Sequence, residues 1–168
     1  MLYGSYYIPP GTPGTLATLD HMRSVAAAGA TSPVVRRVAA SLVAGSDRDP
    51  MLHASLIGNW VIQHSEFLAD PSTTEALLPA WDAIAAIAND GVVQCDCDDV
   101  AILAASLGLS IGLRARFVAV GFDPDPAGPF AHVWTDLGDP SGDAWLTVNP
   151  EAGRLTMPPI TRHTVVEV

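Results

Sequence analysis

The two cysteines of the chain, Cys95 and Cys97, are its candidate nucleophiles and stand one residue apart. A disulfide between them would close too short a loop to stabilise a fold, and it would be strained. A thiol at the first position of a helix faces the positive end of the helix dipole, which favours the reactive thiolate. Cys97 stands where an apolar helical pattern begins, so we expect it to be a nucleophile.

Three carboxylates surround Cys97 in the sequence, those of Asp96, Asp98 and Asp99. Their simplest role is helix capping, with Asp96 as the N-cap residue. Carboxylates close to a thiol also raise its pKa. The helix dipole contributes only about 0.3 to 1 kcal/mol at an exposed terminus, so three carboxylates could cancel it. A reactive Cys97 therefore needs a histidine beside it.

Strand pairing selects one of the five histidines as that partner. If residues 138–143 form the loop of a hairpin, Leu137 pairs with Ala144 and, by the same counting, His132 lies opposite Asn149. Directly opposed residues point to one face with Cβ atoms about 4.5 to 5.5 Å apart. An Asn oxygen that accepts the proton of one ring nitrogen fixes the tautomer and leaves the other nitrogen for the thiol. We therefore predict a Cys97, His132 and Asn149 site.

Other polar side chains are expected near this site in lesser roles. Asp136 shares the face of His132 but stands four residues along the strand, roughly 13 Å away, so we discount it as the orienting group. Gln94 is a candidate donor to an oxyanion hole beside the backbone N–H of Cys97. Asp98 and Trp134 are expected to adjoin the site.

Each member of the predicted triad also has a structural alternative. Cys97 on an apolar helix could be an inert buried cysteine. His132 could be a core histidine between Phe130 and Trp134, and Asn149 could merely end a strand. The order of the three residues along the chain favours the catalytic arrangement over these alternatives.

A metal-binding module is the alternative from another class. Cys95, Cys97, Asp96 and Asp98 mix soft sulfur with hard oxygen ligands and supply no matching histidine pair. We therefore expect neither a metal nor a cofactor.

Hydrophobic periodicity predicts helices first and strands afterwards, which indicates an α+β domain. We expect an irregular arm over residues 1–18, rich in Gly, Pro and Tyr, and a single domain over 19–168. The helix from Cys97 is apolar nearly all round and is predicted to be central and buried. We expect a first helix that begins near Leu19, further helices over 33–44, 50–64 and 80–89, and a last helix that begins at Cys97. A turn is expected at 70–71. Strands are expected over 114–122, 130–137, 144–149 and 164–168.

Charge and composition exclude some partners. The net charge is −10, and all eight basic residues are arginines. Such an acidic surface repels phosphate backbones and anionic lipid, so we expect neither nucleic-acid nor membrane binding. No apolar run reaches the roughly 18 to 20 residues of a membrane span, and the start lacks the pattern of a signal peptide. A cytoplasmic location is the expectation.

Three short motifs, taken in order, resemble the transglutaminase-like superfamily in its short bacterial and phage-type form. CDCDD at residues 95–99 is similar to the family's G-D-C-D-D, which opens the central helix with the nucleophile. HVW at 132–134 matches the H-V-[WY] strand, and WLTVNP at 145–150 matches W-x-x-[LV]-D-P. The likeness covers roughly residues 34–151. It includes, upstream, Trp60, Val61, Phe67 and Asp70.

The resemblance implies a papain-like cysteine proteinase fold and acyl transfer or hydrolysis through a Cys97 thioester, with His132 as base and acid and Asn149 as its partner. A peptide or protein acyl donor is the implied substrate. The chain departs from the family in two places, because Asn149 stands where most members have Asp and Cys95 replaces a glycine. The alternative is a catalytically silent assembly or virion-associated protein that docks on a partner through the N-terminal arm.

Overall fold

The computed structural model describes residues 11–69, 76–123, 125, 128, 130–151 and 157–168. Within these ranges the chain forms a mixed α+β fold. The helices are α1 (Thr12–Thr31), α2 (Pro33–Leu42), α3 (Pro50–His64), α4 (Ala80–Asp90) and α5 (Cys97–Ser110). The strands are β1 (Ser65–Phe67), β2 (Val93–Cys95), β3 (Arg114–Gly121), β4 (His132–Gly138), β5 (Trp145–Val148) and β6 (Arg162–Glu167).

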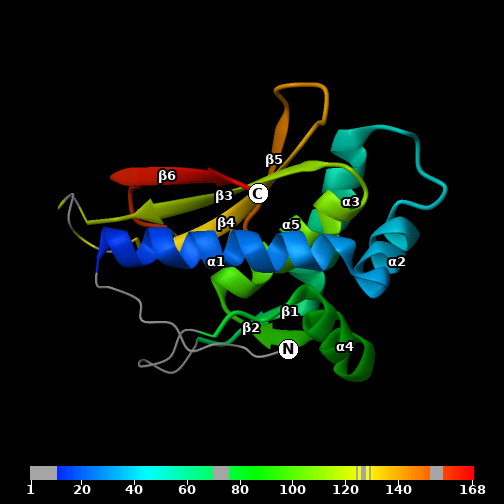
Figure 1. Ribbon diagram of the computed structural model, residues 1–168, viewed down its shortest axis with the longest axis horizontal. Coiled ribbons are helices and arrows are strands. Elements are labelled where there is room, and N and C mark those ends of the chain that lie inside the picture. The colour runs from blue at the N-terminus through cyan, green and yellow to red at the C-terminus, as the bar shows by residue number, and fades with distance from the viewer. Residues whose placement is uncertain (1–10, 70–75, 124, 126–127, 129, 152–156) are drawn as a thin grey trace.

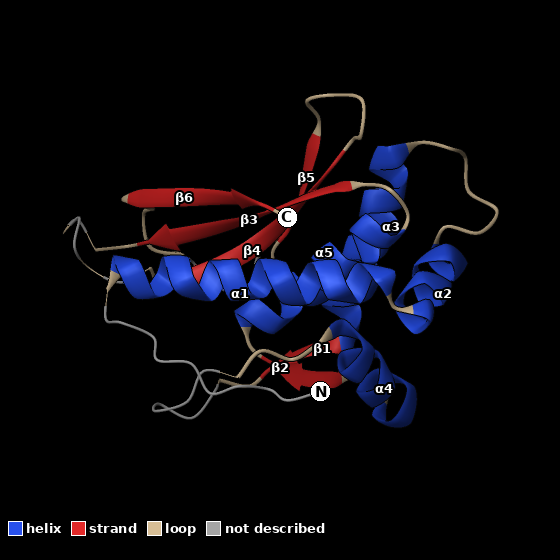
Figure 2. Cartoon of the chain, viewed as in Figure 1, coloured by secondary structure: helices blue, strands red, loops and turns tan. Residues whose placement is uncertain are grey.

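Four of the strands form an antiparallel sheet in the order β5-β4-β3-β6. Figure 1 shows α1 crossing in front of α5 and of this sheet, with α2 and α3 at the opposite end of the molecule from the free ends of β3 and β6. Figure 2 shows the second, smaller sheet of β1 and β2 below α1 and beside α4. The two strands of this small sheet are parallel.

Helix α5 is the centre of the fold, as its sequence predicts. It packs against α1, α2, α3 and α4 on its helical side and against β3 and β4 on the other. Every residue from Asp98 to Gly108 is buried. Its one buried hydroxyl, that of Ser106, donates to the carbonyl oxygens of Ile102 at 2.7 Å and of Ala26 at 3.3 Å, so no donor is left unsatisfied there.

Close packing fixes α5 against strand β4. A Cβ atom at Gly108 would lie 2.5 Å from Cδ2 of Leu137, so only glycine allows the helix to come this near the strand. About two turns earlier on the helix, the hydroxyl of Thr135 donates to the carbonyl oxygen of Ala101 at 2.7 Å. These two contacts set the height of the helix along β4, and therefore the position of its first residue relative to His132.

The N-terminal prediction needs correction. Helix α1 begins at Thr12 rather than near Leu19, because Gly11 and Pro13 form a favourable helix start. Residues 12–18 of the expected irregular arm are therefore helical, and residues 1–10 lie outside the described residues, as does the expected turn at 70–71. The pairing of β1 with β2 was not predicted, since three-residue strands leave little periodicity.

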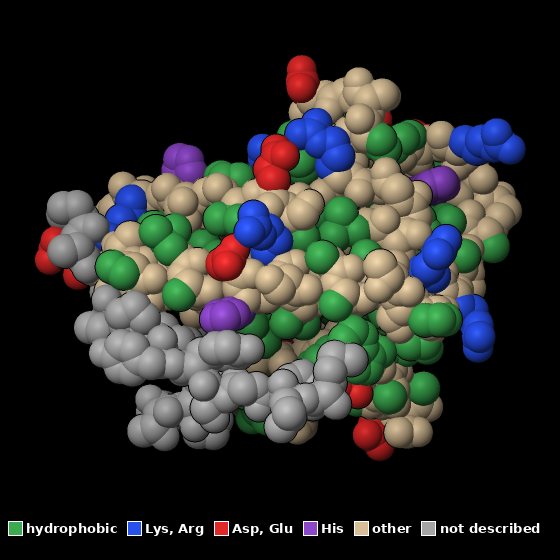
Figure 3. All heavy atoms as spheres, viewed as in Figure 1, with side chains coloured by type: hydrophobic (Ala, Val, Ile, Leu, Met, Phe, Trp, Pro, Cys, Tyr) green, Lys and Arg blue, Asp and Glu red, His purple; other side chains and the backbone are tan. Residues whose placement is uncertain are grey.

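Charged side chains are spread over the visible face of the molecule. On the face shown in Figure 3, arginine and acidic side chains lie scattered among uncharged ones, so the net charge of −10 is not gathered into one patch there.

Within the described residues, none of the helices combines the length and the apolar character that crossing a lipid bilayer requires.

Replacing Thr135 with valine tests the link between α5 and β4. The variant keeps the shape of the side chain but loses the buried hydrogen bond to Ala101, so we expect the free energy of unfolding to fall by about 1 kcal/mol. Urea denaturation measures it. Thr164→Val on β6, a half-buried threonine, is the matched control and should change stability by less than about 0.5 kcal/mol. Equal stability of Thr135→Val and the wild-type protein would contradict the role of this bond.

Candidate active site

Cys97 is the first residue of α5, as predicted. Asp96 holds the N-cap position, but its carboxylate makes no capping hydrogen bond, which corrects the expected role of that side chain. The first backbone hydrogen bond of the helix runs from the N–H of Val100 to the carbonyl of Asp96 at 3.2 Å. The N–H groups of the first turn, including that of Cys97, therefore have no partner within the helix and can serve an anion.

His132 and Asn149 meet in the structure. Nε2 of His132 lies 3.0 Å from Oδ1 of Asn149, and both residues are buried, at 6% and 7% exposure. The same Oδ1 accepts the backbone N–H of Glu151 at 3.0 Å, which identifies it as the oxygen of the amide. Because an amide oxygen only accepts, the imidazole must donate from Nε2. The neutral ring then presents Nδ1 as a free acceptor.

The hairpin that brings these residues together has a register two residues away from the predicted one. Leu137 pairs with Leu146, and Gly138 with Trp145. The turn begins at Asp139, whose carboxylate accepts the backbone N–H of Ser141 at 2.8 Å. A shift of two residues keeps each side chain on its face, because side chains alternate with a period of two. His132 and Asn149 therefore still lie on one face, although they are not directly opposed.

Cys97 and His132 line one cavity of about 360 Å³. Its far wall is the first part of α1, with Thr15, Thr18 and Leu19. The backbone N–H of Val133, next to His132 on β4, hydrogen-bonds the Cys97 sulfur. The sulfur therefore lies near the start of β4, the strand that begins at His132.

The electrostatic setting of Cys97 opposes the thiolate. Burial raises the pKa of its thiol from the ordinary value of 9.0 to about 12. The backbone N–H groups of Val133 and Cys97 lower this pKa in part, and the carboxylates of Asp98 and Asp96 raise it further. Cys97 is therefore a neutral thiol at neutral pH, and its attack requires a base that removes the proton.

Asp136 is engaged elsewhere and does not orient His132, in agreement with the sequence argument. One of its oxygens accepts from Arg116 at 3.0 Å, and the other accepts from Trp134 Nε1 at 3.1 Å and from Thr147 Oγ1 at 2.7 Å. The indole N–H of Trp134 is thus used within the sheet. Its ring remains next to the imidazole of His132, with ring centroids 5.9 Å apart.

Of the other two predicted neighbours, Asp98 lies at the site and Gln94 does not. Asp98 is buried and lines the cavity of Cys97 and His132. Gln94 is exposed on β2, where it pairs with Glu66, and it is not among the residues that line this cavity. The period of the strand turns Gln94 away from the face of its buried neighbour Cys95. The structure therefore does not bring Gln94 to the site.

The acidic cluster comprises Asp96, Asp98 and Asp99, whose carboxylate oxygens lie within 4.8 Å of one another. Asp99 has an evident structural task, because its Oδ1 accepts the backbone N–H of Leu78 at 2.6 Å and so attaches the segment before α4 to α5. Both cysteines are free thiols. Burial, with Asp99 next in effect, raises the pKa of Cys95 to about 12, so this thiol also is neutral.

Two contributors to the site were not predicted, because both are backbone groups. The N–H of Glu151 fixes the Asn149 amide, and the N–H of Val133 contacts the Cys97 sulfur. Pro150 after Asn149 was the one local signal of a turn that folds the chain back onto that amide.

Comparisons with known proteins give a fold but no family. No family model matches the sequence, and no curated protein matches it. A solved structure of a candidate protease from Parabacteroides distasonis has a TM-score of 0.61 at 15% identity, over 95% of this chain and 30% of that one. A candidate cysteine protease from Cytophaga hutchinsonii has a TM-score of 0.48 at 17% identity, over 69% of this chain and 36% of that one. The chain thus spans about a third of the length of either protein.

At this level of identity, the first of these likenesses shows a shared fold. The chain has a mixed α+β fold with an antiparallel sheet, similar to a part of the candidate protease from Parabacteroides distasonis.

The tautomer of His132 provides a direct test of the site. Since Asn149 accepts from Nε2, we expect ¹⁵N NMR of the neutral imidazole to show the proton on Nε2. His64 is a control within the same molecule, because its Nδ1 lies 2.8 Å from the carbonyl oxygen of Trp60 and must carry the proton. In Asn149→Ala the preference of His132 should weaken. A proton on Nδ1 of His132 in the wild-type protein would contradict this geometry.

Proposed function

We propose that the chain catalyses cysteine-dependent acyl transfer or hydrolysis on a peptide or carboxamide, as a transglutaminase-like domain with a papain-like arrangement of helix and sheet. The observation that carries the proposal is the hydrogen bond between His132 and Asn149, whose acceptor oxygen is fixed by the backbone of Glu151. It directs Nδ1 of the ring away from the amide, in a cavity that Cys97 shares.

The reaction begins with the Cys97 proton. It passes to Nδ1 of His132 while the sulfur forms a bond to the substrate carbonyl carbon. In this scheme the backbone N–H of Cys97, at the start of α5, donates to the oxyanion that results. When the intermediate collapses, the carbon–nitrogen bond breaks and the leaving amine takes the proton from the imidazolium. A thioester remains on Cys97.

Water or an amine completes the cycle. The incoming nucleophile gives a proton to His132 and forms a bond to the thioester carbon, and the sulfur leaves with that proton as the Cys97 thiol. Asn149 is neutral, so it orients the ring and stabilises imidazolium less than an aspartate would. The ion pair of sulfur and imidazolium therefore forms only as the reaction proceeds.

A second candidate function rests on the pKa of Cys97. Burial raises that pKa to about 12, which is also what an inert core cysteine shows. The alternative is a catalytically silent assembly protein that keeps the fold and docks through its N-terminal region. The two candidates differ in whether His132 controls the chemistry of Cys97.

Alkylation by iodoacetamide, followed by mass spectrometry at each cysteine, distinguishes them. If His132 is the base, Cys97 reacts measurably at neutral pH, because the imidazole removes the proton of the thiol. His132→Ala should lower the rate at pH 7 by about 100-fold or more. The remaining rate should rise steadily with pH, about tenfold per pH unit, and should not level off below about pH 12, because the raised pKa keeps most of the thiol protonated up to that pH.

Controls come from the same chain. His163→Ala removes an exposed histidine on β6 and should leave the profile of Cys97 unchanged. Cys95, a buried thiol whose pKa is also about 12, should react slowly at neutral pH in every variant. A wild-type profile identical to that of His132→Ala, together with no turnover of an amide panel, would favour the silent protein.

A further inference from the structure

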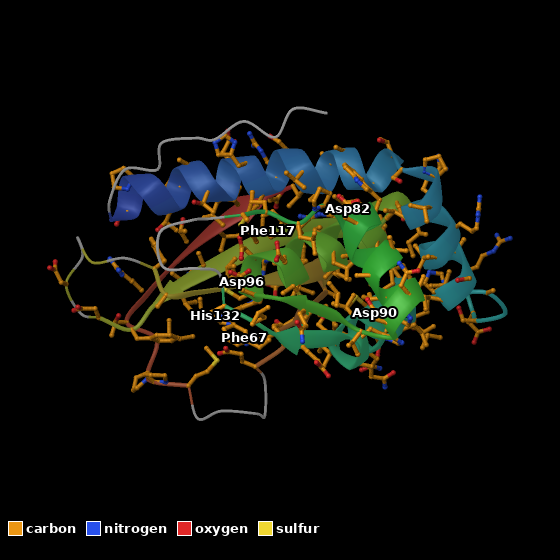
Figure 4. The ribbon with its side chains drawn as sticks, turned by 90° about the horizontal axis from the view of Figure 1, so that it is seen from below. Phe67, Asp82, Asp90, Asp96, Phe117 and His132 are labelled. Atoms are coloured by element: carbon orange, nitrogen blue, oxygen red, sulfur yellow. The ribbon has the colours of Figure 1, made fainter. Side chains whose placement is uncertain are left out.

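A second cavity, of about 160 Å³, adjoins Cys97. Cys97 and Asp96 line both cavities, whereas His132 lines only the larger one. The nucleophile therefore lies between two recesses of different character. Figure 4 shows Phe67, Asp96 and His132 gathered in one region of the molecule, away from Asp90.

The lining of the small cavity is mostly apolar. Val100 from α5, Pro150 after β5, Phe67 of β1 and the neutral thiol of Cys95 contribute to it. Phe67 is 64% exposed, so a ligand in the cavity could contact its ring from the solvent side. An apolar protein cavity of about 150 Å³ is known to stay dry and to bind benzene, so a recess of this size suits one aromatic ring or a large aliphatic group.

Proton transfer decides which part of a substrate enters each cavity. The leaving amine must take its proton from His132, so it departs on the side of the larger cavity, which the imidazole lines. The acyl part stays bonded to the Cys97 sulfur. Its side chain can then enter the small cavity, which Cys97 lines and His132 does not.

We propose that the small cavity is the acyl-side specificity pocket, and that the chain prefers donors whose scissile carbonyl belongs to a residue with an aromatic or large aliphatic side chain. The inference rests on the proposed function and adds the substrate class. Glu151 and Asp96 also line the pocket, and their carboxylates disfavour an acidic side chain there by repulsion and by loss of hydration.

N-acetylated chloromethyl ketones of Phe, Ala and Glu test the pocket by the rate of Cys97 alkylation. The sulfur displaces chloride from each reagent, and His132 accepts the thiol proton. Burial of a phenyl ring should make the Phe reagent at least about tenfold faster than the Ala reagent, and the Glu reagent should be the slowest. Phe67→Ala should reduce the Phe to Ala ratio at least about threefold, since it removes one wall.

Leu68→Ala is the matched control. Leu68 is the next residue and is 55% exposed, but it is not among the residues that line either cavity. This variant should keep the wild-type ratio. A ratio of the Phe to the Ala reagent rate near one in the wild-type protein would overturn the assignment of the small cavity as a specificity pocket. The proposed function would still stand if iodoacetamide labelling of Cys97 depends on His132.

If Cys97 proves unreactive, the binding of small amides to the Cys97→Ala variant tests whether the small cavity takes an aromatic side chain. N-acetylphenylalaninamide should shift the NMR signals of the Val100 methyl groups, and N-acetylalaninamide at the same concentration should leave them in place. This result would support the pocket independently of any turnover. Equal shifts with both amides, or shifts confined to residues outside the pocket, would overturn it.

Discussion

The close contact between helix α5 and strand β4 is the constraint on which the site depends. Gly108 leaves no space for a side chain against Leu137, and Thr135 donates to the helix backbone at Ala101. A buried helix held at two points along a strand cannot slide, because a well-packed interior has no free volume to accept the shift. Cys97 at the start of the helix and His132 at the start of the strand are therefore placed by packing, before any polar contact between them.

Polar contacts then define the chemistry that this placement permits. The backbone of Glu151 fixes the Asn149 amide, the amide fixes the proton of His132, and the free ring nitrogen is left for a thiol. Burial opposes the charged form of that thiol, with a pKa of about 12. The thiol is therefore neutral in the free protein, and under the proposed function it becomes charged only as its proton passes to His132. Two cavities adjoin Cys97: the larger has a mixed polar and apolar lining that includes His132, and the smaller has a mostly apolar lining.

The sequence predicted the parts of the fold whose pattern is strong. The helix over Pro50–His64, the buried helix from Cys97 and the four strands of the antiparallel sheet follow from long apolar periods. The meeting of His132 with Asn149 was predicted on a register two residues away, and it survived because side chains alternate with a period of two. The start of α1, the β1 and β2 pair, and the position of Gln94 could not be read from such patterns. They depend on backbone capping and on strands too short to show a period.

Acylation by p-nitrophenyl acetate, quenched and located by peptide mass spectrometry, tests the central claim most directly. We predict a transient acetyl group on Cys97 and not on Cys95, formed at least about 100-fold more slowly in His132→Ala and at an unchanged rate in His163→Ala. An acetyl group on Cys95, or equal acetylation of Cys97 with and without His132, would contradict the proposal that His132 and Asn149 activate this thiol.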